Sequence, residues 1–295
     1  MSLDVIREFS LDHWDPFPGE IPKSGLEAIL ESGKVLFFPH LRFNFAGDES
    51  RFLSEQWSDG KAKNISFRGH DVPLQGAQGS AADIAQLKAL VARFSGNAES
   101  LVRGLFPHYQ GHLRRGFTSY RTASVEGRET SWRKDDTRLH VDSFPSNPTG
   151  GLRLLRVFSN VNPSGLPRVW RVGEPFADHA ARFFPRASRP LPGSAWVLEK
   201  LGITKSRRTG YDHYMGQLHD LGKADFTYQQ TSPQLNFEFP AGSSWVVFSD
   251  QVLHAVMAGQ FMLEQTFYLE PEHLANPASG PLDFLEGLAG RSLKI

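Results

Sequence analysis

The stretch Pro240-Ala-Gly-Ser-Ser-Trp-Val-Val-Phe-Ser-Asp250 carries the clearest fold signal in the chain: a glycine turn, a buried strand and then an acidic residue. Val252-Leu-His254-Ala-Val follows it and begins a second strand. Short apolar runs bounded by Gly and Pro are typical of strands buried in a sheet. The core of the protein is therefore expected to be rich in β-structure.

Similar apolar or alternating runs lie on both sides of this stretch. The long segment from Glu174 to Gln230 has helical spacing instead. Several short strands with one long excursion between them fit a double-sheet jelly roll better than a parallel doubly wound sheet, which would alternate helix and strand. The runs are Phe117–Ala123, Leu152–Val161, Val169–Val172, Leu235–Phe239, Trp245–Phe248 and Phe261–Leu269.

The chain is expected to form one α+β domain, a double-stranded β-helix of the jelly-roll or cupin-like type, because no repeat or long linker divides its 295 residues. The longest helical stretch starts at Ser80 and is expected to be interrupted at Gly96. The predicted parts are a mixed, mostly helical N-terminal brace (1–115), jelly-roll strands (116–172 and 235–270), a helical insertion (173–234) and a C-terminal tail (271–295).

The composition excludes several classes of protein. Lys plus Arg (32) balances Asp plus Glu (32), so no overall field attracts nucleic acid. The chain has no cysteine, which excludes disulfides, thiolate zinc sites and iron–sulfur clusters, and leaves His, Asp and Glu as metal ligands. No apolar run is long enough for a membrane span, and acids stand where a signal peptide needs an apolar core. A cytoplasmic protein is expected.

Three residues form a candidate metal site. His140 and Asp142 are separated by one residue, and such residues on a strand point to the same side. His254 stands at the head of a later strand. Two imidazoles and one carboxylate make a facial triad with open positions, as in non-haem iron(II) oxygenases, although strand-end histidines can also simply bond to backbone. His108-Tyr-Gln-Gly-His112 has the spacing of a helical zinc pair but lacks its glutamate, so no metal is expected there.

With these motifs the chain resembles the 2-oxoglutarate-dependent iron dioxygenases, and within them the Kdo (3-deoxy-D-manno-oct-2-ulosonic acid) 3-hydroxylases. The resemblance implies that His140, Asp142 and His254 hold iron(II), with 2-oxoglutarate and O2 as cosubstrates. It also implies hydroxylation at C3 of Kdo in Kdo-lipid A of lipopolysaccharide, with succinate and CO2 as coproducts. The strings that carry it are Ser119-Tyr-Arg-Thr-Ala-Ser124, Thr137-Arg-Leu-His-Val-Asp-Ser-Phe-Pro145 and Leu152-Arg-Leu-Leu-Arg-Val-Phe-Ser-Asn-Val-Asn-Pro163.

The sequence departs from the resemblance at the cosubstrate carboxylate. Glu264-Gln265-Thr266 stands where many 2-oxoglutarate enzymes have an arginine, so another cation is needed. In some relatives that cation lies on the strand after the His-x-Asp pair. If Leu154 and Phe158 face the interior, parity places Arg156 inside with them and Arg153 outside. Arg156 is expected to clamp the far carboxylate of 2-oxoglutarate, with an ordinary salt bridge as the alternative.

Local positive charge favours an acidic substrate. Between Arg114 and Arg171, eleven Lys or Arg face five Asp or Glu, a local balance of +6 in a neutral chain. Arg121 and Arg168 flank the metal motif and are expected to contact the anionic substrate, although solvated arginines are the usual explanation. Lys205-Ser-Arg207-Arg208 fits either a membrane-surface phosphate contact or a soluble turn.

A lipid-linked substrate requires the protein to reach a membrane that it does not span. Peripheral contact with an anionic membrane, on the cytoplasmic face of the inner membrane, is therefore expected. The tail stripe Leu282, Leu285 and Leu288 is one candidate for this contact, and packing on the core is its favoured alternative. Two other functions stay open: a 2-oxoglutarate oxygenase acting on another anionic small molecule or a protein side chain, and a non-catalytic sugar-binding jelly roll.

Overall fold

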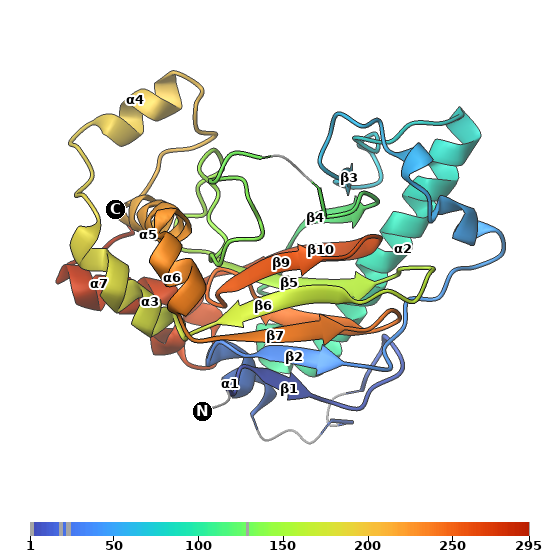
Figure 1. Cartoon of the computed structure of the whole chain (residues 1–295), viewed down its shortest axis with the longest axis horizontal. Coiled ribbons are helices and arrows are strands. Elements are labelled where there is room, and N and C mark those ends of the chain that lie inside the picture. The colour runs from blue at the N-terminus through green and yellow to red at the C-terminus, as the bar shows by residue number, and fades with distance from the viewer. Residues whose placement is uncertain (1–2, 18–19, 22–24, 128–129, 295) are drawn as a thin grey trace.

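The core of the protein consists of two β-sheets packed face to face, shown in Figure 1. The structure, a computed structural model, describes residues 3–17, 20–21, 25–127 and 130–294. Most strand pairs are antiparallel, and helices cover the outer face of the larger sheet and one end of the pair. This is a jelly-roll core, so the predicted α+β fold is confirmed.

The larger sheet has seven strands in the order β1-β2-β8-β5-β10-β4-β3, and only its β1–β2 pair is parallel. Three of these strands come from the N-terminal segment, which is therefore part of the sheet as well as a brace. β1 and β3 have three residues each, too few for a periodic sequence signal. The strands are β1 (Ile6–Glu8), β2 (Val35–Phe38), β3 (Ile65–Phe67), β4 (Arg114–Arg121), β5 (Arg153–Asn160), β8 (Ser244–Phe248) and β10 (Met262–Leu269).

The smaller sheet has the order β7-β6-β9, formed by Gln234–Phe239, Arg168–Gly173 and His254–Ala258. Side chains alternate across the sheets, as the period of two requires. On β8, Trp245 and Val247 point into the space between the sheets and pack with Trp170 of β6. Val246 and Phe248 point the other way, into the helix-covered core.

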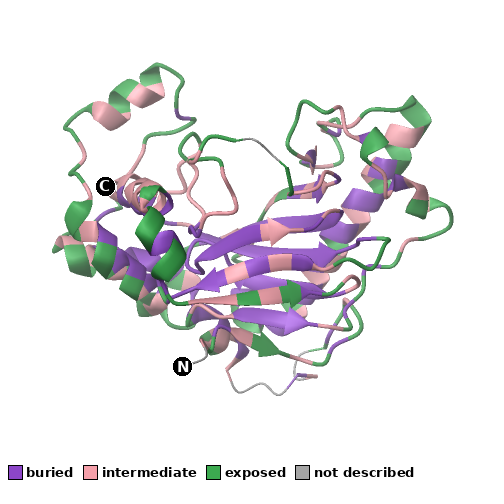
Figure 2. Ribbon diagram, viewed as in Figure 1, coloured by how far each residue is buried: buried purple, intermediate pink, exposed green. Residues whose placement is uncertain are grey.

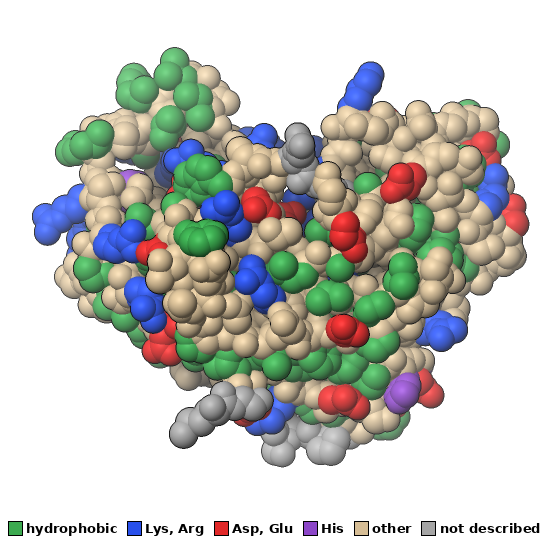
Figure 3. All heavy atoms as spheres, viewed as in Figure 1, with side chains coloured by type: hydrophobic (Ala, Val, Ile, Leu, Met, Phe, Trp, Pro, Cys, Tyr) green, Lys and Arg blue, Asp and Glu red, His purple; other side chains and the backbone are tan. Residues whose placement is uncertain are grey.

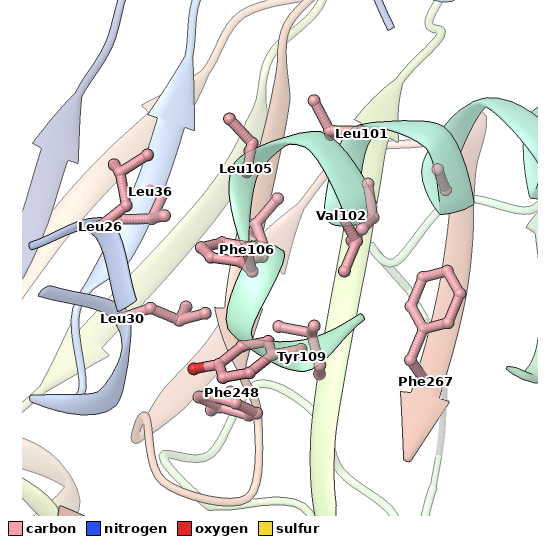
Figure 4. Close-up of a cluster of buried hydrophobic side chains, with 14 of the residues drawn as sticks. Leu26, Leu30, Leu36, Leu101, Val102, Leu105, Phe106, Tyr109, Phe248 and Phe267 are labelled. Carbon is pink, nitrogen blue, oxygen red and sulfur yellow. The ribbon is translucent and has the colours of Figure 1, made fainter. Parts of the chain in front are cut away.

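Helix α2 (Ala81–Leu105) covers the outer face of the larger sheet, together with the short α1 (Leu26–Glu31). Figure 4 shows its C-terminal turns packed over Phe248 and Phe267. The predicted interruption at Gly96 is wrong, because the helix continues through it. A glycine costs about 1 kcal/mol in a helix interior, and the buried residues on both sides of Gly96 outweigh that cost.

The helical segment between β6 and β7 packs at one end of the sheets (Figure 1). Its helices bury Leu139 and Val141, which flank His140, against Leu218 and Leu253. Figure 2 shows that α4 is the least buried of these helices. Within the described ranges, no helix is both long and apolar enough to cross a membrane. The helices are α3 (Phe176–Phe183), α4 (Ser194–Lys200), α5 (Gly210–Ala224), α6 (Phe226–Thr231) and, near the C-terminus, α7 (Pro281–Ala289).

The tail stripe is not a free membrane-facing surface. Leu282 and Leu285 of α7 are buried in the same core cluster as α3 and α5, and Leu285 is 0% exposed. Only Leu288 is exposed, at 40%. The favoured alternative, packing on the core, is therefore confirmed for Leu282 and Leu285, which are not available for contact with a membrane.

Leu285→Ala is expected to lower the free energy of unfolding by about 2–5 kcal/mol, the range for Leu→Ala in a closed core. Denaturant unfolding measures this directly. The matched variant Leu288→Ala, one helical turn away and exposed, should cost much less. Equal and small effects for both variants would show that α7 does not pack as described.

Candidate active site

The three predicted metal ligands meet at one end of the space between the sheets. His140 and His254 are joined by two backbone hydrogen bonds: His140 N donates to His254 O at 3.0 Å and His254 N donates to His140 O at 2.9 Å. Asp142 N donates to Ser249 O at 2.8 Å. His140 forms an isolated bridge and Asp142 lies outside any strand, yet their ligand atoms and that of His254 lie within 4.8 Å of one another.

The histidines are held in the tautomer that a metal needs. Nδ1 of His140 lies 2.7 Å from Arg138 O, and Nδ1 of His254 lies 2.9 Å from Val252 O. A carbonyl can only accept, so each Nδ1 carries the hydrogen and each Nε2 keeps its lone pair. Burial lowers the pKa of both histidines, and for His140 the nearby His254 adds to that effect. Both imidazoles are thus neutral and ready to bind a cation.

Asp142 stays ionised in spite of its burial. Burial alone would raise its pKa, but the Arg156 guanidinium above all opposes burial, and the pKa is held below its ordinary value. Arg156 Nη1 lies 3.0 Å from Asp142 Oδ2, although without the geometry of a hydrogen bond. That oxygen has no hydrogen-bond donor in the described structure, so it is available to a cation.

Glu264 lies in the same site between two arginines. Both Nε and Nη2 of Arg121 donate to Glu264 Oε2, at 3.1 and 2.6 Å, and Arg156 Nη1 lies 3.2 Å from Oε1. Burial alone would raise the pKa of Glu264, but Arg121 and then Arg156 lower it. The negative charge of Glu264, which would repel the carboxylate of a ligand, is therefore neutralised by Arg121 and Arg156. Arg156 is shared between Glu264 and Asp142.

A cavity of about 490 Å³ opens over the three ligands. Seven Lys or Arg and three Asp or Glu line it, so its walls are positively charged. Arg121, Arg156 and Arg168 are all among the lining residues, as parity predicts for Arg156. Arg168 Nη1 donates to Gly259 O at 2.8 Å. A cavity with this charge suits small anionic ligands.

Arg153 lies on the opposite face of β5, as expected, but it is not at the surface. Its side chain is fully buried, with Nε donating to Asp250 at 2.7 Å and Nη2 donating to Gln251 at 2.6 Å. Its guanidinium also stacks on Phe248. Arg153 thus stabilises the turn that precedes His254, whereas Arg156 on the same strand lines the cavity.

The sequence did not identify several cavity residues. Trp170 stacks on His254 with ring centroids 5.0 Å apart, and His219 of α5 meets His140 edge to face at 5.5 Å. Lys223, one turn further along α5, donates to Arg133 O at 3.0 Å. The spacing of His219 and Lys223 places them on one helix face, but only the packing of α5 shows that this face looks at the ligands.

The donor set fits iron(II). Two neutral imidazoles and one carboxylate on one face of an ion leave the opposite face open, the arrangement used by non-haem iron(II) oxygenases. His108 and His112 do not join a comparable group: among the described residues, only His140, Asp142 and His254 form a cluster of three or more potential ligands. His112 instead stacks on His273 with ring centroids 3.6 Å apart.

Comparison with known proteins agrees with this donor set. Residues 13–292 match the family model described as 3-deoxy-D-manno-oct-2-ulosonic acid (Kdo) hydroxylase. Among solved structures, the chain is similar to the Kdo hydroxylase KdoO, a non-heme Fe(II) alphaketoglutarate-dependent dioxygenase. For its complex with alphaketoglutarate and Fe(III), the identity is 46% and the TM-score 0.92, over 98% of this chain and 97% of that chain. For its apo structure, the values are 47% and 0.93 over the same shares. A search of curated proteins finds no match.

Proposed function

This chain belongs to the Kdo hydroxylase family, and from that membership we propose that it is an iron(II)- and 2-oxoglutarate-dependent dioxygenase that hydroxylates Kdo. The observation that carries the proposal is the convergence of two unprotonated Nε2 atoms and one ionised carboxylate on a positively charged cavity. Kdo and 2-oxoglutarate are both anions, which such a cavity attracts. Hydroxylation at C3, with succinate and CO2 as coproducts, completes the proposal.

His140, Asp142 and His254 would hold iron(II), which when bound supplies the activation of O2 that protein side chains cannot provide. The chain's own contribution is to fix the ligands. The paired backbone bonds between His140 and His254 hold the two rings, and their Nδ1 contacts to Arg138 and Val252 keep the Nε2 atoms aimed at the ion. A rigid ligand set leaves the remaining positions for 2-oxoglutarate and O2.

Arg156 is proposed to hold the far carboxylate of 2-oxoglutarate. Its guanidinium is buried in the lining of the cavity, next to Asp142 and Glu264. An arginine presents two parallel N–H groups to a carboxylate, so it can orient as well as attract the cosubstrate. Glu264 and Arg121 support this arrangement, because Arg121 compensates Glu264 and leaves Arg156 able to face a further anion.

Arg121 and Arg168 are proposed to contact the sugar acid. Both reach the cavity from strands on opposite sheets, β4 and β6, so a substrate between them would be held from two sides. Holding the sugar against the metal site is the positioning role that gives a hydroxylase its regioselectivity. The finer proposal is that the substrate is Kdo attached to lipid A, met by a peripheral protein at the cytoplasmic face of the inner membrane.

The proposal is tested by incubating the protein with Kdo-lipid A, Fe(II), 2-oxoglutarate and O2. Mass spectrometry should find one added oxygen atom in the Kdo unit, together with one succinate for each product molecule. Lipid A without Kdo is the matched control and should stay unmodified. If another anion stimulates succinate formation and Kdo-lipid A does not, the proposed substrate is wrong, but the proposed 2-oxoglutarate oxygenase activity stands.

A further inference from the structure

The segment from Arg189 to Arg208 projects from the body of the protein and carries α4 near its tip (Figure 1). Five of the ten large hydrophobic side chains exposed in the described structure lie within its thirteen residues 191–203. Isolated exposed hydrophobics are ordinary, but half of the total in one short projection is a patch. Its members are 45–75% exposed: Leu191, Trp196, Val197, Leu201 and Ile203.

A second cavity, separate from the metal site, lies between this projection and the C-terminal α7. Its volume is about 850 Å³, and its lining includes five Lys or Arg and one His but no Asp or Glu. Arg189, Arg207 and Arg291 take part in no ion pair recorded for the described part of the chain, so their charges are not compensated within it. The basic lining residues are Arg189, Arg207, Arg208, His213, Arg291 and Lys294.

The apolar patch and the cationic cavity share one side of the molecule. In Figure 3 hydrophobic side chains gather on the lobe over α4, and Lys or Arg side chains lie directly beneath them. Leu198, on the inner side of α4, lines the cavity, whereas Trp196 and Val197 point away from it into solvent. An apolar tip with a cationic zone behind it matches a bilayer, in which the acyl chains lie deeper than the phosphates at the surface.

This surface continues into the mouth of the active-site cavity. Lys205, at the base of the projection, lines that cavity, and its backbone N donates to Ser146 O at 3.0 Å. Arg208 Nε donates to Pro145 O at 3.2 Å, and both Pro145 and Ser146 belong to the active-site wall. A lipid phosphate seated beside Arg208 would therefore place the attached sugar beside the wall of the active-site cavity.

From these observations we infer that the 189–208 projection inserts its apolar tip into a bilayer and that the cavity behind it binds a lipid phosphate monoester. The ligand class is a phosphorylated lipid headgroup, and the cationic, acid-free lining distinguishes it from a neutral or cationic partner. The inference rests on the proposed function for the identity of the lipid, but the binding itself does not require catalysis. It also replaces the α7 stripe as the membrane contact, since two of the three leucines of that stripe are buried.

The test is co-sedimentation with vesicles of phosphatidylcholine, with or without phosphatidic acid. Wild type should bind the phosphatidic acid vesicles far more tightly. Trp196→Ser/Leu201→Ser should lower the partition coefficient about tenfold or more, because two large apolar side chains lose their burial. Arg207→Glu/Arg291→Glu should lower it by a similar factor on phosphatidic acid vesicles and leave weak binding to phosphatidylcholine unchanged.

The controls separate this site from a general effect. Leu166→Ser removes an exposed leucine on the β5–β6 loop, and Arg103→Glu reverses a charge on α2; both should bind as wild type. Thermal unfolding and anaerobic binding of Fe(II) with 2-oxoglutarate verify that each variant is folded. Binding that is unchanged in both double variants, or absent in wild type, would overturn the inference. If inorganic phosphate raises the unfolding temperature of the wild type but the wild type does not bind vesicles, the cavity would be assigned to free phosphate instead.

These outcomes are independent of the proposed reaction. If Kdo-lipid A is not hydroxylated but the vesicle results hold, the docking surface stands and the substrate is wrong. If Kdo-lipid A in detergent is hydroxylated equally by wild type and both double variants, while binding to vesicles is also equal, the reaction stands and the docking surface is wrong.

Discussion

Replacing Asp142 by alanine is expected to abolish iron(II) binding and, with it, all succinate formation. Asp142 is the only carboxylate in the cluster of three ligands, and its ionised oxygen has no hydrogen-bond donor in the described structure. Losing a residue that merely orients a ligand costs about 10- to 100-fold in metal affinity or activity, and losing the ligand itself should exceed that. Anaerobic addition of Fe(II) and 2-oxoglutarate measures the site through the weak visible band of the chelated cosubstrate.

Asp136→Ala is the matched control for this variant. Asp136 also lines the cavity, but it pairs with Lys63 and is not part of the ligand cluster. Asp136→Ala should keep the visible band, whereas Asp142→Ala should lose it. The two variants should have the same unfolding temperature. A wild-type protein that is folded and shows no band would contradict the iron site and every step of the reaction proposed from it.

Arg156→Ala is expected to raise the half-saturation concentration for 2-oxoglutarate by about 10- to 100-fold. Hydrogen bonds to charged groups contribute about 1.5–3 kcal/mol, and each 1.4 kcal/mol is a tenfold change in affinity. The effect should appear mainly in the KM for 2-oxoglutarate rather than in the KM for the sugar. Steady-state succinate assays with each substrate varied in turn make this distinction, and Arg156→Lys should recover part of the affinity.

Arg153→Lys on the same strand gives the opposite pattern. Arg153 is buried on the other face of β5 and holds Asp250 and Gln251, so the variant should lower the free energy of unfolding without changing the KM for 2-oxoglutarate. An unchanged KM in Arg156→Ala would assign the cosubstrate carboxylate to another cation of the cavity.

The elements that could be predicted from the sequence are those with strong local patterns. The six predicted strand runs coincide with β4 to β8 and β10, because each combines an apolar pattern with Gly or Pro boundaries. His140, Asp142 and His254 could be identified because spacing and strand context together point to one chemistry. Gly96 misled the prediction, since a single glycine weakens a helix locally while tertiary packing determines whether the helix continues.

The remaining features depend on contacts between segments far apart in the chain. Glu264 stands where many 2-oxoglutarate enzymes have an arginine, but its neutralisation by Arg121 depends on the register of β10 against β4, which no local pattern specifies. The burial of Leu282 and Leu285 depends on the docking of α7 against α3 and α5. The exposure of Trp196 and Leu201 could not be predicted from the sequence either, because an apolar residue in a helical insertion is ordinarily expected to pack against the core.

The backbone bridge between His140 and His254 has a consequence for how the enzyme matures. The two histidines are 114 residues apart in the chain, and β5, β6, the helical insertion, β7 and β8 all lie between them. Closing so long a loop is unfavourable until the intervening strands have paired. The unfolded chain is therefore expected to bind iron more weakly than the folded protein, so that metal uptake follows folding rather than guiding it. Bound metal should accordingly stabilise the native state by mass action, so that starvation for iron shortens the lifetime of the enzyme as well as silencing it.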